Sequence, residues 1–340
     1  MVLVAVCAMA GCGASQSGSG TSRPVLLTPG ASALTPPAAS ATPAPSALAA
    51  WSAPAATGPG IILFAISCPD ATFCAAVGIR SQPAGDIAVV YTDGSWSSPV
   101  AIESGALVNS VSCASGTFCV AVDSGGRAVT FDGQSWSPPT RISPVLLASV
   151  SCSSTTFCAA VGTNGSGQPH LSEAVTYDGS QWSSPLTVHA DTNALMEGVS
   201  CSSANFCAAV DNYGEALMYR DGSWSLPISI VAHDLLNSVS CPSSNFCLTV
   251  GTDGIVATFS GASWSAPARA NNRQSIAAIS CASSDFCVGV PASGNNALIY
   301  KGQIWSTTGA IDSGQGFWVS CPTTTFCGAA DLGGRVFLLH

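Results

Sequence analysis

The sequence predicts an all-β fold built from seven repeats of four short strands, and three observations lead to this prediction. A Ser-Cys-x4-Phe-Cys pattern occurs seven times, with first cysteines 45, 39, 49, 40, 40 and 40 residues apart. A Trp-Ser dipeptide also occurs seven times. Charged residues make up only 8% of the 340-residue chain, whereas 34 glycines and 21 prolines supply turns. Few charges with many turn formers favour short strands over helices.

Each repeat divides into four strands. The first strand ends in Ser-Cys, the second begins at Phe-Cys, and the third follows a Gly-containing turn, as in residues 127–131. The fourth begins at Trp-Ser, as in 136–139. A Pro stands three residues after six of the seven tryptophans, with Thr308 in the last repeat. Because Pro cannot donate to a strand ladder, this strand belongs at the outer edge. Four strands repeating near every 40 residues are typical of β-propeller blades.

The two ends of the chain complement each other. Trp51 lies 17 residues before Cys68 with no cysteine pair ahead of it, and the chain ends after Cys327 without a final Trp-Ser. We therefore expect the N-terminal strand to complete the C-terminal blade, so that residues 49–340 close into a seven-bladed β-propeller. An open array with a frayed end is the alternative.

One repeat shows a distant likeness to a known family. Residues 176–182, Thr-Tyr-Asp-Gly-Ser-Gln-Trp, resemble the Asp-box of sialidase-like propellers, which reads Ser/Thr-x-Asp-x-Gly-x-x-Trp. The Asp and Gly are adjacent here, and the corresponding stretch 260–264 has no Asp. The Trp-Asp dipeptide of the WD-repeat family is absent from the chain.

The N-terminus resembles that of a bacterial lipoprotein. An apolar run from Val2 to Ala10, too short to span a bilayer, ends in the lipobox-like Met9-Ala10-Gly11-Cys12. The resemblance implies a signal peptide over residues 1–11 and acylation of Cys12, which would anchor the protein to the outer face of the cell membrane. An ordinary secretory signal is the alternative. Residues 12–48, rich in Ser, Ala, Pro and Thr, are expected to form a disordered linker.

The repeated cysteines are expected to form structural disulfides. Fourteen of the 16 cysteines fall into seven Cys-x5-Cys pairs, which indicates an oxidising compartment. A structural zinc site needs four ligands, whereas each repeat offers two thiols, and a redox motif would read Cys-x2-Cys. We expect no metal and no cofactor. The predicted bridges are Cys68–Cys74, Cys113–Cys119, Cys152–Cys158, Cys201–Cys207, Cys241–Cys247, Cys281–Cys287 and Cys321–Cys327.

Charge argues against nucleic acid as a partner. The net charge is −9, with nine basic residues in all and no basic cluster. The membrane is expected to be contacted through the lipid anchor only, and the protein is expected to be a monomer. No nucleotide-binding loop and no HExxH motif occurs.

Ligand-binding residues are sought where the repeats differ, because positions shared by all repeats serve the blade. By analogy with the architecture, blade connections and turns between second and third strands form the binding face. These segments supply Glu103, Arg141, His170, His189, Asp191, His233, Asp234, Arg273 and Asp312. Four residues before each first cysteine stand Phe64, Asn109, Ala148, Glu197, Asn237, Ala277 and Phe317, several of which we expect at the channel mouth.

Two interpretations of these candidates remain open. His189, Asp191, His233, Asp234 and Glu197 could hold a metal or act as acid and base, or they are solvated loop residues. Trp318, which replaces a small residue of other repeats, could stack on a sugar or peptide, or fill the centre.

The function predicted from these features is that of a surface-anchored binding or interaction module for a glycan, peptide or protein. The alternatives are a glycan-directed hydrolase or lyase on the same scaffold, and a passive structural protein of the envelope. Enzymatic activity is left undecided, with binding favoured, because the arginines and glutamates of a sialidase site are too few and too scattered.

Overall fold

The computed structural model describes residues 50–103, 106–164, 171–190, 194–232, 234–270, 273–311, 314 and 316–340. The predicted signal peptide and nearly all of the predicted linker lie outside these residues. Within them, the one helical element is a 3₁₀ turn at Thr252–Gly254. No helix in this part of the chain is long and apolar enough to cross a membrane.

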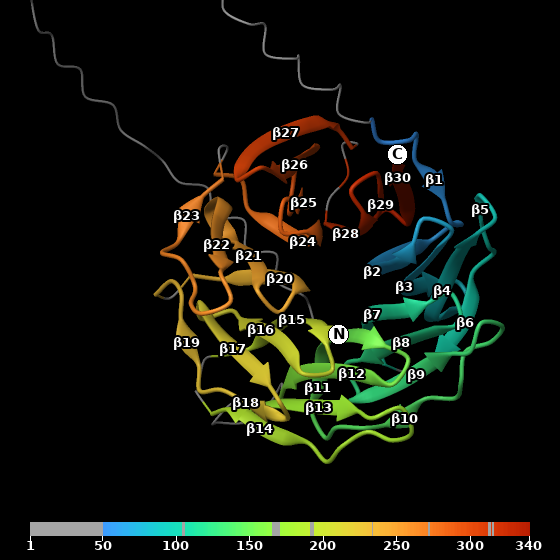
Figure 1. The fold of residues 1–340 in the computed structure, drawn as a ribbon. Helices are drawn as coiled ribbons and strands as arrows, with labels where there is room; N and C mark the ends of the chain where they lie inside the picture. Colours follow the sequence, from blue (N-terminus) through green and yellow to red (C-terminus); the bar gives the residue numbers. More distant parts are fainter. Residues whose placement is uncertain are drawn as a thin grey trace, which may run out of the picture. The chain divides into compact units, whose positions relative to one another are not determined.

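Seven antiparallel sheets surround a common axis, with the first strand of each sheet innermost (Figure 1). Blade 1 contains β2 (Ile61–Asp70), β3 (Phe73–Ser81), β4 (Ala84–Thr92), β5 (Ser95–Trp96) and β6 (Val100–Glu103); blade 2 contains β7 (Val108–Ser115), β8 (Phe118–Asp123), β9 (Arg127–Phe131) and β10 (Thr140–Arg141). Blade 3 contains β11 (Leu146–Ser154), β12 (Phe157–Thr163), β13 (Ser172–Tyr177) and β14 (Leu186–His189). The predicted all-β propeller is confirmed.

The remaining blades repeat this order. Blade 4 contains β15 (Met196–Ser203), β16 (Phe206–Asp211), β17 (Glu215–Arg220), β18 (Ser223–Trp224) and β19 (Ile228–Ser229); blade 5 contains β20 (Leu236–Ser243), β21 (Phe246–Gly251), β22 (Ile255–Phe259) and β23 (Ala268–Arg269). Blade 6 contains β24 (Ile276–Ser283), β25 (Phe286–Pro291), β26 (Asn296–Lys301) and β27 (Ile304–Ala310). Blade 7 contains β28 (Phe317–Thr323), β29 (Phe326–Asp331), β30 (Arg335–Leu339) and β1 (Ala55–Ala56) from the N-terminal side.

The ring closes as the sequence predicts. Strand β1 pairs antiparallel with β30, and Trp51 forms a further bridge to Leu339. The Trp51 side chain is buried in the core between blades 6 and 7. The N-terminal residues therefore supply the outer strand that the last repeat lacks.

A ring of hydrogen bonds explains the serine of the Ser-Cys motif. In every blade this serine Oγ accepts the backbone N–H of the first cysteine in the following blade, at 2.8 to 2.9 Å. The bond from Cys68 N–H to Ser320 Oγ, which spans the closure of the chain, is one of these. The motif thus joins neighbouring blades as well as the strands within each blade.

Each Cys-x5-Cys pair forms a disulfide across its first hairpin. The Cα atoms of each pair lie 3.9 to 4.1 Å apart, and the second cysteine of every pair is fully buried. The cysteines are therefore part of the blade core. Cys7 and Cys12 lie outside the described residues.

The Trp-Ser motif fastens the outer edge of each blade. In six blades the indole packs on an aromatic ring of the third strand, with centroids 5.2 to 5.5 Å apart. The Pro that follows interrupts the outer strand, which in blade 1 splits into β5 and β6. Blade 6 has Thr308 instead, and its outer strand β27 runs unbroken. The interruption therefore follows the proline, which cannot donate to the ladder.

Candidate functional site

The inner strands carry a ring of β-bulges near the start of each blade. In six blades the pairing register slips by one residue four positions before the first cysteine. The bulged residues are Phe64, Asn109, Ala148, Glu197, Asn237 and Ala277. Bulges turn a side chain away from its regular direction and are common beside functional sites. Six of the seven expected positions therefore share one backbone geometry.

Blade 7 departs from this pattern, which corrects the sequence alignment at Phe317. Phe317 pairs directly with Asp331 without a bulge, and its side chain is fully buried. It therefore occupies the core position of Leu63 in blade 1 and does not belong with the bulged residues. Trp318 is half-buried and meets Phe64 edge to face, with ring centroids 6.3 Å apart.

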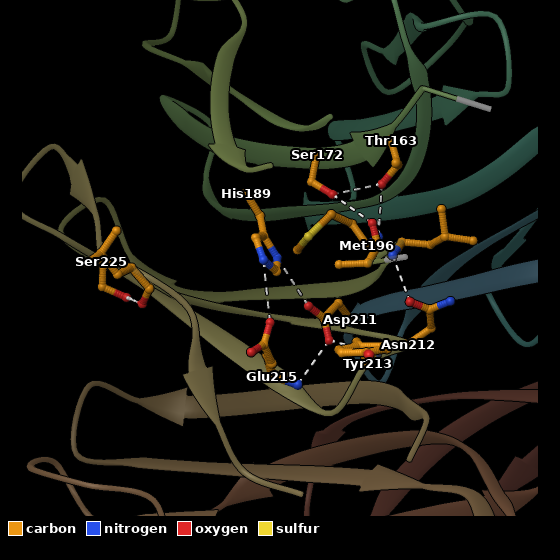
Figure 2. A network of polar contacts seen from close by, with 12 residues as sticks. Thr163, Ser172, His189, Met196, Asp211, Asn212, Tyr213, Glu215 and Ser225 are labelled. Atoms are coloured by element: carbon orange, nitrogen blue, oxygen red, sulfur yellow. Dashed lines mark hydrogen bonds and ion pairs between the residues drawn. The ribbon is translucent and has the colours of Figure 1, made fainter. Parts of the chain in front are cut away.

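A cluster of charged side chains lies where blade 3 meets blade 4 (Figure 2). Asp211, at the end of β16, is fully buried, and its Oδ1 accepts the backbone N–H groups of Tyr213 and Glu215, each at 2.9 Å. His189, the last residue of β14, places Nδ1 3.5 Å from Asp211 Oδ2 and Nε2 3.5 Å from a carboxylate oxygen of Glu215. His189 thus lies between two carboxylates from the neighbouring blade.

The same turn recurs in blade 2 with a different side chain at one position. Asp123 Oδ1 accepts the N–H groups of Gly125 and Arg127, as Asp211 does with its own turn. Arg127 Nε then donates to Asp123 Oδ2 at 2.8 Å. The turn therefore contains one negative and one positive charge.

Blade 7 repeats this arrangement with Asp331 and Arg335, whose Nε donates to Asp331 Oδ2 at 2.9 Å. Blade 4 has the corresponding aspartate, Asp211, but Glu215 stands where the other two blades have an arginine. The turn that the other two blades neutralise internally thus contains two carboxylates.

Burial changes the protonation of the acidic groups around this cluster. Desolvation raises the pKa of Asp211, while hydrogen bonds from the N–H groups of Glu215 and Tyr213, and the nearby His189, oppose the rise. Glu197, on the innermost strand β15, has its pKa raised to about 7, first by desolvation and then by the charge of Asp211. Part of its side-chain surface is open to solvent, so this carboxyl is crowded by protein and still accessible.

A carboxyl that keeps its proton near neutral pH can act as a general acid. A glycosidase needs a second carboxyl group that can reach the substrate. Asp211, whose charge acts on Glu197, is fully buried and held by two backbone N–H groups, so it cannot fill that role. Asp211 therefore is not the second carboxyl of a glycosidase pair with Glu197.

A second buried carboxyl lies at the boundary of blades 1 and 2. Asp86, in β4, is 2% exposed, its Oδ1 accepts Val108 N–H at 3.3 Å, and its Oδ2 forms no hydrogen bond. Desolvation raises its pKa to about 6; the Val108 bond and the charge of Arg127 oppose this rise, and the charge of Asp123 adds to it. Asp86 also lines a surface hollow of about 430 Å³ beside Arg80 and Leu107.

Asp86 should make folding stability depend on pH. Its folded pKa of about 6 lies above the ordinary value of 3.8, so the folded state binds the proton more tightly than the unfolded chain. This contribution is complete below about pH 4 and is lost as pH rises through 6. The free energy of unfolding should therefore fall by up to about 3 kcal/mol between pH 4 and 6.5. In Asp86→Asn this part of the fall should be absent, so the Tm should depend less on pH. Calorimetry showing parallel pH profiles would contradict this expectation.

The predicted site residues divide into three groups. His189 and Glu197 lie near the Asp211 cluster. Arg141 lies away from it in β10, where its side chain donates to Pro144 O at 3.3 Å. Arg273 is exposed in the connection between blades 5 and 6. Asp234 is half-buried in the connection to β20, and Glu103 lies in β6 opposite Asp86. The residues that fall outside the described part of the chain are His170, Asp191, His233 and Asp312.

Sequence reasoning missed Asp211 and Glu215. Both lie in the turn between second and third strands of blade 4, on the face where sites are sought. A comparison of the repeats could have revealed them, since Asp211 and Glu215 align with Asp123 and Arg127 and the second pair differs in charge. What the repeats could not show is that His189 of the preceding blade points at this pair.

A hollow of about 770 Å³ lies between the outer strands of blades 4 and 5. We call it the blade 4–5 groove. Its walls include Trp224, Trp264, Ile228, Arg220 and several serines. Each indole packs at a tilted angle on a ring of its own blade, Trp224 on Tyr219 and Trp264 on Phe259. The Nε1–H of Trp264 is buried without a hydrogen-bond partner.

Comparisons with known proteins confirm the fold. No protein-family model matches the chain, and no curated protein matches it. Among solved structures, YCF48 bound to D1 peptide is 15% identical over 88% of this chain and 99% of its own, with a TM-score of 0.64. YCF48 from Cyanidioschyzon merolae is 14% identical over 86% and 99%, with a TM-score of 0.63.

A third similar structure is the β-propeller domain of Cps50 (Swd1) from Myceliophteria thermophila, which is 12% identical over 79% of this chain and 93% of that one, with a TM-score of 0.60. The likeness is one of fold. At these identities it assigns no ligand to this chain.

Proposed function

We propose that this propeller is a binding module for an extended segment of a partner protein, which it takes up in the blade 4–5 groove. The observation that carries the proposal is the groove itself, about 770 Å³ in volume, whose walls combine Trp224, Trp264 and Ile228 with several serines. Apolar side chains beside a few hydroxyl groups suit a ligand that presents both side chains and unpaired backbone groups.

The shape and chemistry of the groove favour a peptide over a glycan. Both indoles of the groove pack against an aromatic ring of their own blade, so they form fixed parts of its wall. The serine hydroxyls and the apolar Ile228 suit alternating backbone and side-chain contacts. YCF48, which has the same fold, has been solved bound to the D1 peptide, so a propeller of this architecture can hold such a ligand.

Binding should be lost when the groove is filled. A displayed peptide library is selected against the full chain, and the selected peptides are then tested on Ala266→Arg. This substitution lies on the groove wall at an exposed position. We expect affinity to fall at least 10-fold.

The matched control is Ser184→Arg, which makes the same change at the corresponding exposed position of blade 3 and should leave affinity unchanged. Peptides that bind both variants equally, or a selection that yields no peptide, would exclude the groove as a peptide site.

We also propose that the propeller is held at the outer face of a bacterial cell membrane by acylated Cys12, as the lipobox-like sequence implies. Seven buried disulfides agree with an oxidising compartment. The mass of the N-terminal peptide from cells tests this proposal, because acyl chains on Cys12 would be seen directly.

A further inference from the structure

The turn between β16 and β17 carries a charge arrangement that the equivalent turns avoid. Asp123 and Asp331 each pair with an arginine four residues later. In blade 4 that residue is Glu215, so two carboxylates share the turn. Asp211 is nevertheless fully buried, which is unfavourable for a carboxylate unless a positive charge compensates it. The position that a guanidinium occupies in the other turns is therefore suited to a different cation.

The atoms around this position form a set of metal ligands. One ligand atom each from His189, Asp211 and Glu215 lie within 4.8 Å of one another. Neither Asp211 Oδ2 nor His189 Nδ1 forms a hydrogen bond, although both atoms are buried. Figure 2 shows the imidazole ring directed at the two carboxylates. Asp211 Oδ2 and His189 Nδ1 thus face each other at 3.5 Å as buried polar atoms without a hydrogen bond, a pair that a bound cation would join.

One of the separations is close to that required for coordination. Metal bonds of about 2.1 Å at a tetrahedral angle place two ligand atoms roughly 3.4 Å apart. His189 Nδ1 and Asp211 Oδ2 are 3.5 Å apart. The Glu215 carboxylate, whose side chain is 23% exposed, lies within 4.8 Å of the other two ligand atoms and would have to move closer to bind the same ion. A fourth position remains for water or a further ligand.

We propose that His189, Asp211 and Glu215 bind a divalent transition-metal ion, with Zn²⁺ as the ion to test. An imidazole nitrogen with two carboxylates suits Zn²⁺, whereas Ca²⁺ and Mg²⁺ prefer oxygen ligands alone. The ion would take the place of the arginine and would also join β14 of blade 3 to the turn of blade 4. This departs from the sequence-based prediction of no metal, and it does not depend on peptide binding between blades 4 and 5.

The test uses the full chain, stripped with chelator and titrated with ZnCl₂ alone in a calorimeter. The native chain should bind one Zn²⁺ at this site and show a raised Tm with the metal. Glu215→Arg restores the Asp–Arg pair found in blades 2 and 7, so it should keep the fold while weakening Zn²⁺ binding at least 10-fold. Asp211→Asn, nearly identical in shape, should weaken binding to a similar extent and serves if the arginine variant folds poorly.

Asp123→Asn is the matched control, because it removes the equivalent carboxylate from blade 2 and should leave Zn²⁺ affinity unchanged. Cys7 and Cys12 are present in every variant, so any binding by their thiols is common to all. The proposal is overturned if the native chain binds no Zn²⁺, or if Glu215→Arg and Asp211→Asn bind it as tightly as the native chain.

Discussion

Complete reduction of the seven disulfides should lower the Tm by roughly 20 °C. Each bridge closes a loop of about six residues, for which chain entropy predicts about 2 kcal/mol. Allowing for strain, seven bridges contribute on the order of 10 kcal/mol, which is comparable to the whole stability of a domain. For a chain of this size, 1 kcal/mol corresponds to about 2 °C in Tm. Scanning calorimetry of the oxidised and reduced, alkylated protein measures the difference.

A variant that lacks one disulfide shows how much a single bridge contributes to the Tm. Replacing Cys113 and Cys119 together by serine should lower the Tm by only about 3 °C, since it removes one of the seven loop constraints. Intact mass before and after reduction confirms that the bridges were present and then opened. If the fully reduced protein melted at the same temperature as the oxidised one, the disulfides would have no structural role.

Deleting residues 49–57 should lower the Tm by at least about 10 °C. The deletion removes Trp51, whose loss alone corresponds to about 3–5 kcal/mol for a buried indole. It also removes the pairing of β1 with β30, the bond from Ser52 N–H to Leu338 O at 2.7 Å, and the buried bond from Thr57 Oγ1 to Gly334 O at 2.8 Å. Blade 7 would then expose the edge of β30. Thermal unfolding monitored by circular dichroism measures the effect.

The matched control deletes residues 13–45, which the sequence predicts to be a spacer. This deletion is longer, yet it should leave the Tm unchanged because it keeps the strand that closes the ring. Equal effects of the two deletions would mean that the N-terminal strand does not hold blade 7 together.

The fold could be predicted because its signals are local and repeated. The spacing of Ser-Cys and Trp-Ser indicated the blades, and the unmatched Trp51 indicated how the ring closes. The proline effect on the outer strand was also visible, since Thr308 marks the one blade whose outer strand is continuous. The ring of serine hydrogen bonds between blades was not foreseen, because six of its bonds join residues 40 to 50 positions apart and the seventh joins Cys68 to Ser320, 252 positions away. Only the folded propeller brings these residues together.

The site was predicted less well, for a physical reason. His189 and Glu197 were recognised as departures from the repeat, but their neighbour Asp211 has counterparts in blades 2 and 7 and resembled a structural residue. Asp211 differs from these counterparts because Glu215 replaces the arginine that would pair with it, and because His189 of blade 3 lies beside it. Phe317 was misplaced because a bulge adds one residue in six blades, and a bulge leaves no mark in sequence spacing alone.

The ring of hydrogen bonds from cysteine N–H to serine Oγ also suggests how a propeller of this kind could arise by duplication and gain or lose blades. Every Ser-Cys unit carries an acceptor for the next copy and a donor for the previous one, so a tandem duplication adds a blade with both of its boundaries already complementary. The bond between Cys68 and Ser320 is as short as the other six, so the junction between the chain ends is chemically equivalent to any internal one. The number of blades is therefore set by how far neighbouring sheets rotate about the axis.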